Sequence, residues 1–329
     1  MSNYLTSLQE AAGFMREHDR FLIISHVNPD GDTTSSALAT ALMLEQIGKT
    51  YAIVNEGETP AKFAFLPRFE QIRNLQTDQV TETFSAVIAV DAADSRRMGN
   101  VAHLFAPDVQ IVNIDHHPTN DHFGQVNVIR TDAAATAEMM YELMQAGGFT
   151  CSHELAICMY TGLLTDTGGF RYSNTTPNVM NIAAALLGYG VKPGEVAERC
   201  LEEITLGHVQ ILRRALQSLQ ISHDGLVACL RVGYADLKET GATSEDASGL
   251  VNYARNIEGV EVGVSFVEQE PGVVKVSLRA RSQVDVSKIA QSLGGGGHAK
   301  AAGCSLKGSL AQVEELLFAK LNDLPGVNK

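Results

Sequence analysis

The sequence predicts an α/β fold in which a doubly wound, mostly parallel sheet is joined by a helical connector to a second, smaller α+β domain. In the first half of the chain, short apolar runs alternate with segments of helical periodicity, which is typical of a parallel sheet with helices on both faces. From residue 221 onward the apolar runs are short and β-like, and turn residues separate them. We therefore expect residues 1–190 to form the first domain, 191–220 the helical connector and 221–329 the second domain.

Four apolar runs in the first domain have the length of buried strands and end in turn or helix signals. They predict strands at 21–25, 51–54, 85–90 and 110–114. Apolar residues with helical spacing predict helices at 8–17, 34–47, 133–145, 154–164, 177–187 and 195–219. In the second domain we expect strands at 226–232, 260–266 and 273–278, and helices at 248–257 and 286–293.

Composition restricts the class of protein. The chain has 329 residues and a net charge of -13, so it lacks the excess of Lys and Arg with which proteins bind long duplex DNA. A small anionic substrate is compatible with this charge, because a bound metal supplies positive charge locally. The five cysteines are scattered without the spacing of zinc ligands, which indicates reduced thiols. With no signal-peptide pattern, and no apolar run near the ~20 residues that span a bilayer, we expect a cytoplasmic protein without a membrane partner.

Side chains that bind metals follow the first predicted strand. His26, Asn28, Asp30 and Asp32 come directly after the apolar run 21–25, in the segment HVNPDGD. Open α/β sheets bind their ligands at the carboxyl ends of the strands. A histidine and two carboxylates at such a point repel one another or are desolvated unless a cation joins them, and this ligand set suits manganese, zinc or iron. The alternative is a polar turn in which an aspartate caps the next helix.

Three further segments place acids or histidines at the ends of predicted elements. Asp91 follows the strand 85–90, and Asp115-His116-His117 follows the apolar run that begins at Gln110. Asp166 stands at the C-terminus of a predicted helix, where the helix dipole disfavours a negative charge. Each segment has an ordinary alternative, such as a helix cap or a surface histidine pair. One metal-binding site above the sheet explains all of them together.

A glycine-rich loop distinguishes the second domain. Arg279 lies in a predicted β-run, and the loop itself is Gly294, Gly295, Gly296 and Gly297 followed by His298. Glycine lets a backbone approach a ligand closely, and successive backbone N–H groups can form an anion-binding nest. Arg279 and His298 add donors suited to phosphate. The alternative is a flexible linker, which is disfavoured because the small residues 301–303 follow at once and predict the start of a helix.

The segments HVNPDGD, VDAAD, IDHH and TDTGGF occur in this order and resemble the four motifs of the DHH phosphoesterase superfamily. The resemblance covers roughly residues 15–180. It implies a doubly wound sheet that binds two divalent metal ions, expected to be Mn²⁺. For the first ion it implies the ligands His26, Asp30 and Asp91. For the second it implies Asp32, Asp91, His116 and Asp166, so that Asp91 is shared.

The same resemblance implies roles beside the substrate for Asn28 and His117. Two metal ions about 3.5–4 Å apart stabilise the attacking and leaving oxygens of an in-line displacement at phosphorus. His117 would then either assist the leaving oxygen or stabilise charge on the phosphoryl group, and both roles stay open.

The second half, at about residues 220–325, resembles the DHH-associated C-terminal domain. In that domain the glycine loop and the preceding arginine contact the nucleotide of the substrate. The implied binding residues are Arg279, Gly295, Gly296, Gly297 and His298. Arg281 is a weaker match, because Ala280 stands where that domain commonly has a serine.

Together the two halves are similar to the stand-alone bifunctional oligoribonuclease and pAp phosphatase group. This implies a homodimer that hydrolyses short RNA oligonucleotides, linear dinucleotides such as pGpG, and 3′-phosphoadenosine 5′-phosphate (pAp). A family II pyrophosphatase lacks the glycine loop, a RecJ-type exonuclease has an added domain, and cyclic-dinucleotide phosphodiesterases commonly have membrane and sensor segments. An exopolyphosphatase-like hydrolase stays open. A catalytically silent nucleotide sensor is disfavoured, because every implied metal-ligand position holds a metal-binding residue.

Overall fold

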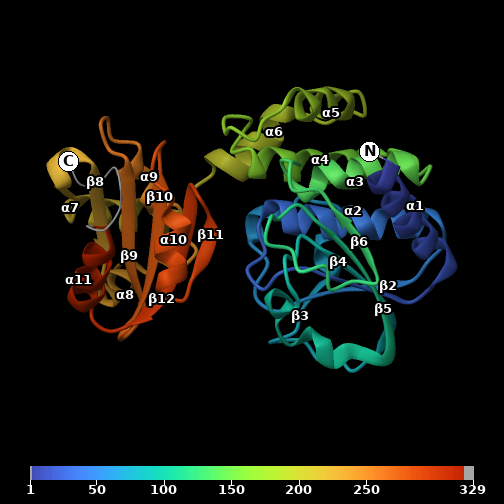
Figure 1. The fold of residues 1–329 in the computed structure, drawn as a ribbon, viewed down its shortest axis with the longest axis horizontal. Coiled ribbons are helices and arrows are strands. Elements are labelled where there is room, and N and C mark those ends of the chain that lie inside the picture. The colour runs from blue at the N-terminus through green and yellow to red at the C-terminus, as the bar shows by residue number, and fades with distance from the viewer. Residues whose placement is uncertain (1, 322–329) are drawn as a thin grey trace. The chain divides into compact units, whose positions relative to one another are not determined.

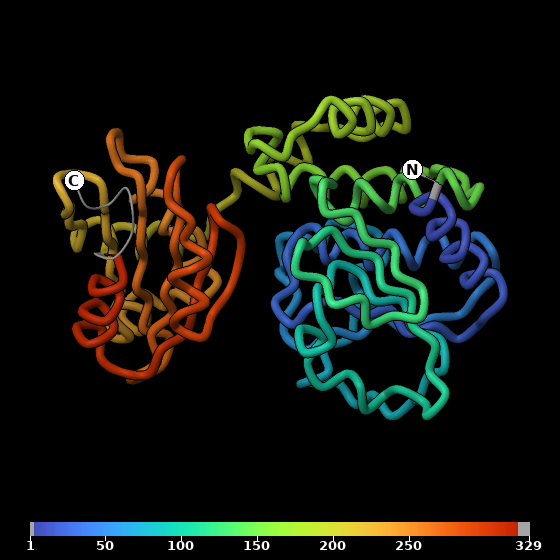
Figure 2. Tube along the Cα trace, in the orientation of Figure 1, coloured from blue at the N-terminus to red at the C-terminus, as the bar shows by residue number. Residues whose placement is uncertain are grey.

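A computed structural model describes residues 2–321 of the chain (Figure 1). Contacts divide it into two compact units, Met1–Glu203 and Ile204–Lys329, and the tube in Figure 2 traces the chain through both. The predicted α/β fold, with a mostly parallel sheet and a smaller α+β module, is confirmed. Among the helices of residues 2–321, none is both long enough and apolar enough to cross a bilayer.

The first unit is built on a six-stranded sheet, sheet A, with the order β3-β2-β1-β4-β5-β6. All neighbouring strands in it are parallel. The strands are β1 (Phe21–Ile24), β2 (Tyr51–Asn55), β3 (Ile72–Asn74), β4 (Phe84–Val90), β5 (Phe105–Asp115) and β6 (Val126–Ile129). This is the order of the doubly wound dinucleotide-binding folds, in which successive strands are first added on one side of β1 and then, from β4 onward, on its other side.

Side chains alternate between the two faces of sheet A, so each strand contributes to two cores. Phe21 and Ile23 pack with helices on one face, whereas Leu22 and Ile24 pack with Met98 and its neighbours on the other. The helices of the first face are α1 (Ser2–Glu17), α2 (Gly31–Gln46), α3 (Thr136–Ala146) and α4 (His153–Asp166) (Figure 1). The opposite face is covered by the 3₁₀-helical segment Ser95–Leu104 instead of a long α-helix.

The outermost helix of the first unit is α5 (Pro177–Leu187), which contacts α4. A short α6 (Pro193–Ala197) and a π-helical turn (Glu198–Glu202) follow it. The stretch 191–220, for which the sequence predicts a helical connector, thus contains α6, this turn and then α7 (Leu206–Gln217). The contact division falls between Glu203 and Ile204.

The second unit contains a six-stranded sheet, sheet B, with the order β11-β12-β10-β9-β8-β7. Neighbouring strands in sheet B are antiparallel, except that β8 and β9 are parallel. The strands are β7 (Gln220–Ser222), β8 (Val227–Val232), β9 (Val262–Glu270), β10 (Val273–Ala280), β11 (Gly296–His298) and β12 (Ala301–Lys307). The helices are α7, α8 (Tyr234–Thr240), α9 (Leu250–Arg255), α10 (Val286–Ser292) and α11 (Leu310–Leu321).

One face of sheet B packs on α10 and α11, and the other packs on α7, α8 and α9 over strand β8. The predicted helix start at 301–303 is wrong, because this segment is the beginning of strand β12. Ala302 and Cys304 alternate into the core, and β12 pairs with β10 along seven residues. Alternation of buried residues along the segment, together with this pairing, stabilises a strand there.

Candidate active site

The candidate site lies at the carboxyl ends of β1 and β4, the two central strands of sheet A. After β1 the chain continues to β2 on one side, and after β4 it continues to β5 on the other side. The loops that leave the carboxyl ends of β1 and β4 therefore diverge, which opens a crevice for ligands. His26 follows β1, Asp91 follows β4, and Asp115 is the last residue of β5. The fold thus brings residues from distant parts of the chain to one edge of the sheet.

Asp91 is the central residue of this edge. It is buried, with 2% of its surface exposed, and its φ angle of 56° is left-handed, which is unusual for a residue other than glycine. The hydroxyl of Thr33 donates to Asp91 Oδ2 at 2.7 Å, and the hydroxyl of Thr136 donates to Oδ1 at 3.0 Å. Strained backbone persists only where surrounding contacts hold it, and it is concentrated at functional sites. These bonds hold the Asp91 carboxylate in one position.

Three histidines surround the Asp91 carboxylate. The nearest nitrogens of His26, His116 and His117 lie 3.5, 3.6 and 3.7 Å from its oxygens. His116 Nε2 also lies 3.4 Å from Asp166 Oδ2. Among the described residues, no Lys or Arg forms an ion pair with Asp91 or Asp166. The ion-pair partners of these two carboxylates within the described residues are therefore histidines.

Potential ligand atoms in the cluster fall into groups that lie within 4.8 Å of one another. One group is His26, Asp30 and Asp91, a second is Asp32, His116 and Asp166, and a third is Asp91, His116 and His117. The structure therefore brings together all six residues for which the sequence predicts metal binding. His117, expected beside the substrate, is also close enough to Asp91 and His116 to belong to a metal-ligand group.

The orientation of His116 fits a bound cation. Its Nδ1 lies 3.3 Å from the backbone oxygen of Ala133, which makes Nδ1 the hydrogen-bond donor. Nε2 then faces the carboxylates of Asp91 and Asp166. A neutral imidazole would direct a lone pair at two anions, so this geometry requires either a proton or a metal ion between them. Histidine ligands of metals commonly donate their second N–H to a backbone carbonyl in this way.

His26 supplies a second observation that fits a cation. The side chain is buried, and its Nδ1 has no hydrogen-bond partner in the described part of the chain. Its Nε2 contacts the hydroxyl of Thr33 at 2.9 Å and Asp91 at 3.5 Å. Nε2 is therefore the nitrogen that faces the cluster and is available to a metal ion, as in His116.

The carboxylates of the cluster have strongly perturbed protonation. Burial and the charge of Asp91 raise the pKa of Asp32 to about 8. Burial and the neighbouring carboxylates of Asp32, Asp30 and Asp91 raise the pKa of Asp166 well above its usual range. Burial would also raise the pKa of Asp91, but its contacts with histidines outweigh this and lower it. Crowded buried acids that resist ionisation form a site where a divalent cation binds favourably.

The pKa values of His26 and His116 are raised, although burial alone would lower them. Burial alone would lower the pKa of His26, but the nearby carboxylate of Asp91 raises it above its ordinary value. The pKa of His116 is raised for the same reason, by Asp91 and by Asp32, against the effect of burial. In the absence of a metal, protons on these rings would occupy the places that cations fill when bound.

Asp32 and Asp30 also act as helix caps, which was the alternative interpretation of the segment. Asp30 is the N-cap of α2 and accepts from the Thr33 N–H at 3.0 Å. Asp32 accepts from the backbone N–H groups of Thr136 and Ala137 at the start of α3, at 2.6 and 2.9 Å. A carboxylate has about four lone-pair sites, so these bonds leave capacity for a metal. Capping and metal binding are therefore compatible here.

Sequence reasoning missed the role of Asp115 as a partner of His117. Asp115 is fully buried, and its Oδ1 lies 2.7 Å from His117 Nδ1. The amide of Asn120 donates to the other oxygen at 2.7 Å. A carboxylate only accepts, so His117 carries its proton on Nδ1 and presents Nε2 as the acceptor. The signal was present in the sequence, because Asp115 stands two residues before His117 at a strand end.

Asn28 is the one predicted site residue of the first unit that the structure does not join to the cluster. It is exposed on the loop after β1, and among residues 2–321 no hydrogen bond connects it with the aspartates or histidines. The hydroxyls of Thr33 and Thr136, which sequence reasoning did not single out, contact Asp91 instead. Thr136 is 45 residues from Asp91 along the chain, so no local pattern could reveal this contact.

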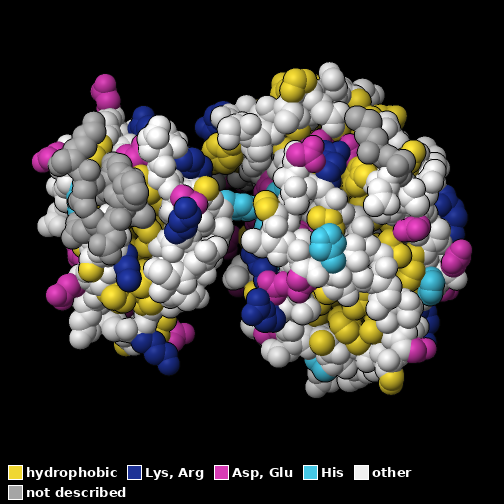
Figure 3. Space-filling model, viewed as in Figure 1, with side chains coloured by type: hydrophobic (Ala, Val, Ile, Leu, Met, Phe, Trp, Pro, Cys, Tyr) yellow, Lys and Arg dark blue, Asp and Glu magenta, His cyan; other side chains and the backbone are white. Residues whose placement is uncertain are grey.

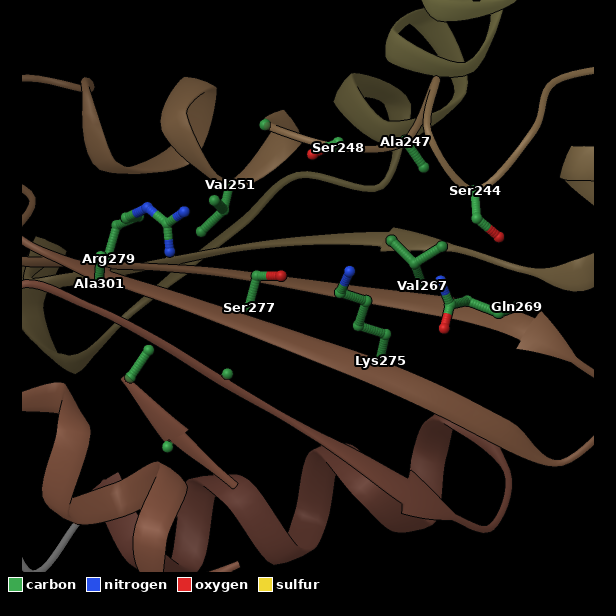
Figure 4. A pocket seen from close by; sticks show the side chains of 14 residues that line it. Ser244, Ala247, Ser248, Val251, Val267, Gln269, Lys275, Ser277, Arg279 and Ala301 are labelled. Atoms are coloured by element: carbon green, nitrogen blue, oxygen red, sulfur yellow. The ribbon is translucent and has the colours of Figure 1, made fainter. Parts of the chain in front are cut away.

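The second unit contains a pocket of about 270 Å³ against strand β10 (Figure 4). Arg279 and Gly296 are among its lining residues. Gly295, Gly297 and His298, which the sequence predicts beside the substrate, are not among them. Arg281 is committed elsewhere: its guanidinium donates to the backbone oxygens of Val260, Arg255 and Ile257.

The glycines of the loop are not equivalent. A Cβ on Gly295 would lie 2.2 Å from the backbone oxygen of Gly303, and one on Gly297 would lie 2.5 Å from that of Ala301. Gly297 also has a φ angle of 135°, which other residues rarely adopt. Gly296 has no atom within 4 Å of a Cβ added there. Packing therefore requires glycine at 295 and 297, whereas at Gly296 the absent side chain leaves open space beside the pocket.

Comparison with known proteins identifies the class. Residues 20–163 match the N-terminal domain of the DHH family, and residues 225–324 match the DHHA1 domain. The fold and the site are those of a metal-dependent enzyme that hydrolyses phosphoester bonds. The chain belongs to the DHH family of phosphoesterases.

Relatives with known names match most of the chain. It is 38% identical to the bifunctional oligoribonuclease and PAP phosphatase NrnA of Thermus thermophilus, over 87% of this chain and 84% of that protein. It is 28% identical to NrnA of Bacillus subtilis, over 88% of this chain and 90% of that protein. In fold it is similar to an exopolyphosphatase-related protein from Bacteroides fragilis, with a TM-score of 0.88, 22% identity, and coverage of 95% and 96% of the two chains.

Proposed function

We propose that this enzyme hydrolyses short RNA oligonucleotides and linear dinucleotides to mononucleotides, and also removes a phosphate from pAp. The observation that carries the proposal is the position of Asp91, whose carboxylate belongs to two different groups of metal-ligating side chains. A shared carboxylate is what a pair of adjacent ions requires. The names of relatives that match most of the chain, oligoribonuclease and PAP phosphatase, support the choice of substrate.

The proposal assigns His26, Asp30 and Asp91 to one divalent ion and Asp32, His116 and Asp166 to the other. It adds Asp91 to the second ion as a shared ligand, because Asp91 also forms a group with His116 and His117. The mixture of imidazole and carboxylate ligands suits Mn²⁺, Zn²⁺ or Fe²⁺ better than Ca²⁺ or Mg²⁺, which prefer all-oxygen ligand sets. Among these ions we propose Mn²⁺, the ion that the family resemblance implies. When bound, the two ions would neutralise charge on the phosphoryl oxygens and lower the pKa of an attacking water.

The side chains of the cluster would position the metal ligands and transfer protons during hydrolysis. Thr33 and Thr136 hold the Asp91 carboxylate through their hydroxyls. Asp115 fixes the ring of His117 with the proton on Nδ1. His117 Nε2 can therefore take a proton, and as an imidazolium His117 can deliver one to the departing ribose oxygen. Asn28, exposed on the β1 loop, is proposed to donate from its amide to a phosphoryl oxygen.

Substrate binding is assigned to residues 221–329 and catalysis to residues 1–190, with 191–220 as the connector. The pocket against β10 contains Arg279, which is suited to phosphate, and its volume of about 270 Å³ lies just below the usual range for small-molecule sites. Gly296 supports close approach of a ligand, since packing does not require glycine there. Gly295 and Gly297 shape the loop, and His298 on β11 adds a donor at its end.

Charge supports a short substrate rather than a long duplex. The net charge is -13, so most of the surface repels a polyanion, and binding depends on local cationic positions. The five cysteines form no disulfide, which supports a reducing compartment such as the cytoplasm.

We further propose a homodimer that uses the outer face of α5. Met180, Leu187 and Tyr189 are exposed there by 49%, 41% and 46%, and Figure 3 shows hydrophobic side chains over this helix. Residues 173–191 contain no charged side chain. In a chain of net charge -13, an uncharged apolar face is where two copies approach with least repulsion. Light scattering should find a dimer in the wild type. A monomer for Leu187→Glu would support the outer face of α5 as the dimer interface.

Product analysis tests the substrate assignment. Purified protein with Mn²⁺ should convert pGpG, pApA and a five-residue RNA to mononucleotides, and pAp to AMP, while a twenty-residue RNA is hydrolysed slowly. The chelated protein should be inactive. His298→Ala should raise KM for these substrates while the bound metal stays at the wild-type level. Preference for pyrophosphate or cyclic di-AMP would contradict the substrate assignment, and binding of dinucleotide without any product would favour a silent sensor.

A further inference from the structure

The pocket in the second unit continues along β10 beyond the arginine that the sequence singles out. Lys275, Ser277 and Arg279 alternate on the same face of this strand, and all three line the pocket. Figure 4 shows their side chains one after another along β10, with Lys275 near Gln269 and Arg279 near Ala301. Lys275 and Arg279 are four positions apart along the strand, so their Cα atoms are about 13 Å apart.

The floor between the two cations is made of small residues. Ser277 pairs with Gly303 on β12, and Arg279 pairs with Ala301. Ala302 and Gly303 also line the pocket. Because none of these side chains extends far from the sheet, an extended ligand can lie along β10 between Arg279 and Lys275.

The charge of this pocket differs from that of the chain as a whole. Its lining residues include Lys275 and Arg279 but no Asp or Glu, in a chain that has 38 acidic and 25 basic residues. Within residues 2–321, Lys275 forms no ion pair with a carboxylate, and its side chain is exposed. The hydroxyls of Ser244 and Ser248 line the opposite wall, where they can donate to a ligand. Two cationic side chains that are separated along one pocket suit a ligand with two anionic groups along its length.

We propose that Lys275 binds an additional phosphate of fragments longer than a dinucleotide, and so sets how strongly the enzyme prefers them. This inference rests on the proposed function. In pAp and in a 5′-phosphorylated dinucleotide, one phosphate is the reacting group and a single further phosphate remains for Arg279. A trinucleotide has one phosphate more, and Lys275 is the unused cation of the same pocket. Lys275 is therefore a residue that determines substrate length, distinct from the glycine loop and Arg279.

Steady-state kinetics on pAp, pApA, pApApA and the five-residue oligoadenylate test this role. For Lys275→Ala, the ratio of the pApApA KM to the pAp KM should rise about tenfold over the wild type, which is at the lower end for a charge-assisted hydrogen bond. Lys275→Arg should restore most of the ratio. The dependence of log KM for pApApA on log salt should also weaken by about 0.7 in Lys275→Ala, because one phosphate contact to a single strand is lost.

Lys288→Ala is the matched control, because Lys288 is an exposed lysine of the same unit that lies outside the pocket and pairs with Asp285. It should leave the KM ratio and the salt dependence at the wild-type values. An equal rise of KM for pAp and pApApA in Lys275→Ala, or no rise for either, would overturn the proposal. These results leave the proposed function intact if the wild type still hydrolyses the panel. If the wild type hydrolyses none of it, the proposed function fails and the role of Lys275 fails with it.

Discussion

Removal of the metal should give the first unit an unusual dependence of stability on pH. Asp32 is fully buried, and its pKa is raised to about 8, whereas an aspartate in the unfolded chain titrates near 3.9. A carboxyl group with a raised pKa holds its proton more tightly in the folded state. Its contribution to stability is therefore full below the unfolded pKa and is lost as the pH rises toward about 8.

The size of the effect follows from this difference in pKa. Between pH 5 and pH 8, Asp32 alone should lower the free energy of unfolding of the metal-free protein by about 4 kcal/mol. The raised pKa values of Asp166, His26 and His116 act in the same direction. For a unit of this size, the Asp32 contribution corresponds to a fall in melting temperature of about 8–16 °C.

The assay is thermal unfolding from pH 5 to pH 8, with chelator and with Mn²⁺. The chelated protein should melt at progressively lower temperature as the pH rises. Mn²⁺ should raise the melting temperature most at pH 8, because ligands must be deprotonated to bind it. Asp32→Asn removes the titrating group and should flatten the profile of the chelated protein, whereas the exposed Asp108→Asn should not. A melting temperature that is constant or rises with pH in the chelated wild type would refute the reasoning.

Three further predictions concern single residues of the two sites. Asp91→Ala should abolish binding of both metal ions, whereas Asp166→Asn should weaken only the ion bound by Asp166, Asp32 and His116. Metal analysis after dialysis measures this, and one ion fully retained in Asp91→Ala would exclude a shared ligand. Asp115→Asn should lower kcat by roughly 100-fold or more with metal content unchanged, because the proton of His117 is no longer held on Nδ1. A wild-type pH–rate profile in this variant would contradict the role of Asp115 in positioning His117. Gly295→Ala should destabilise the second unit by about 1–3 kcal/mol in denaturant unfolding, because its Cβ would meet the Gly303 oxygen at 2.2 Å, whereas Gly296→Ala should unfold like the wild type and raise KM. Equal effects on unfolding would contradict the difference in packing, and an unchanged KM in Gly296→Ala would contradict a ligand beside Gly296.

The central strands of sheet A were predictable because they are buried on both faces. Strand β1, for example, is buried at all four positions and reads as a continuous apolar run. The polar residues that follow it stand directly at the strand end, and parallel strand ends meet at one edge of the sheet. Proximity of the acids and histidines could therefore be predicted from sequence without knowledge of any side-chain contact. The contacts of Thr136 could not, because they depend on how α3 packs beside the cluster.

The strands that sequence reasoning missed have a physical feature in common. β3 and β6 are the two edges of sheet A, and β7 and β11 are the two edges of sheet B. Each of these four is three or four residues long and pairs on one side only, so it buries too little to need an apolar run. The fifth missed strand, β12, is internal, but its first residues are alanine and glycine, which have low β-propensity. It is a strand because β10 and β11 pair with it on either side.

This error in β12 also explains why the pocket of the second unit was only partly predictable. Arg279 and the glycines could be singled out from their residue types, but the floor of the pocket depends on the pairing of Ser277 with Gly303 and of Arg279 with Ala301. If 301–303 began a helix, Lys275 would be an ordinary surface lysine at the end of a strand. Once β12 is placed beside β10, the small residues of β12 leave the β10 face uncovered, and Lys275 and Arg279 line one pocket. The substrate-length hypothesis therefore arises from strand pairing, which the residue types alone do not specify.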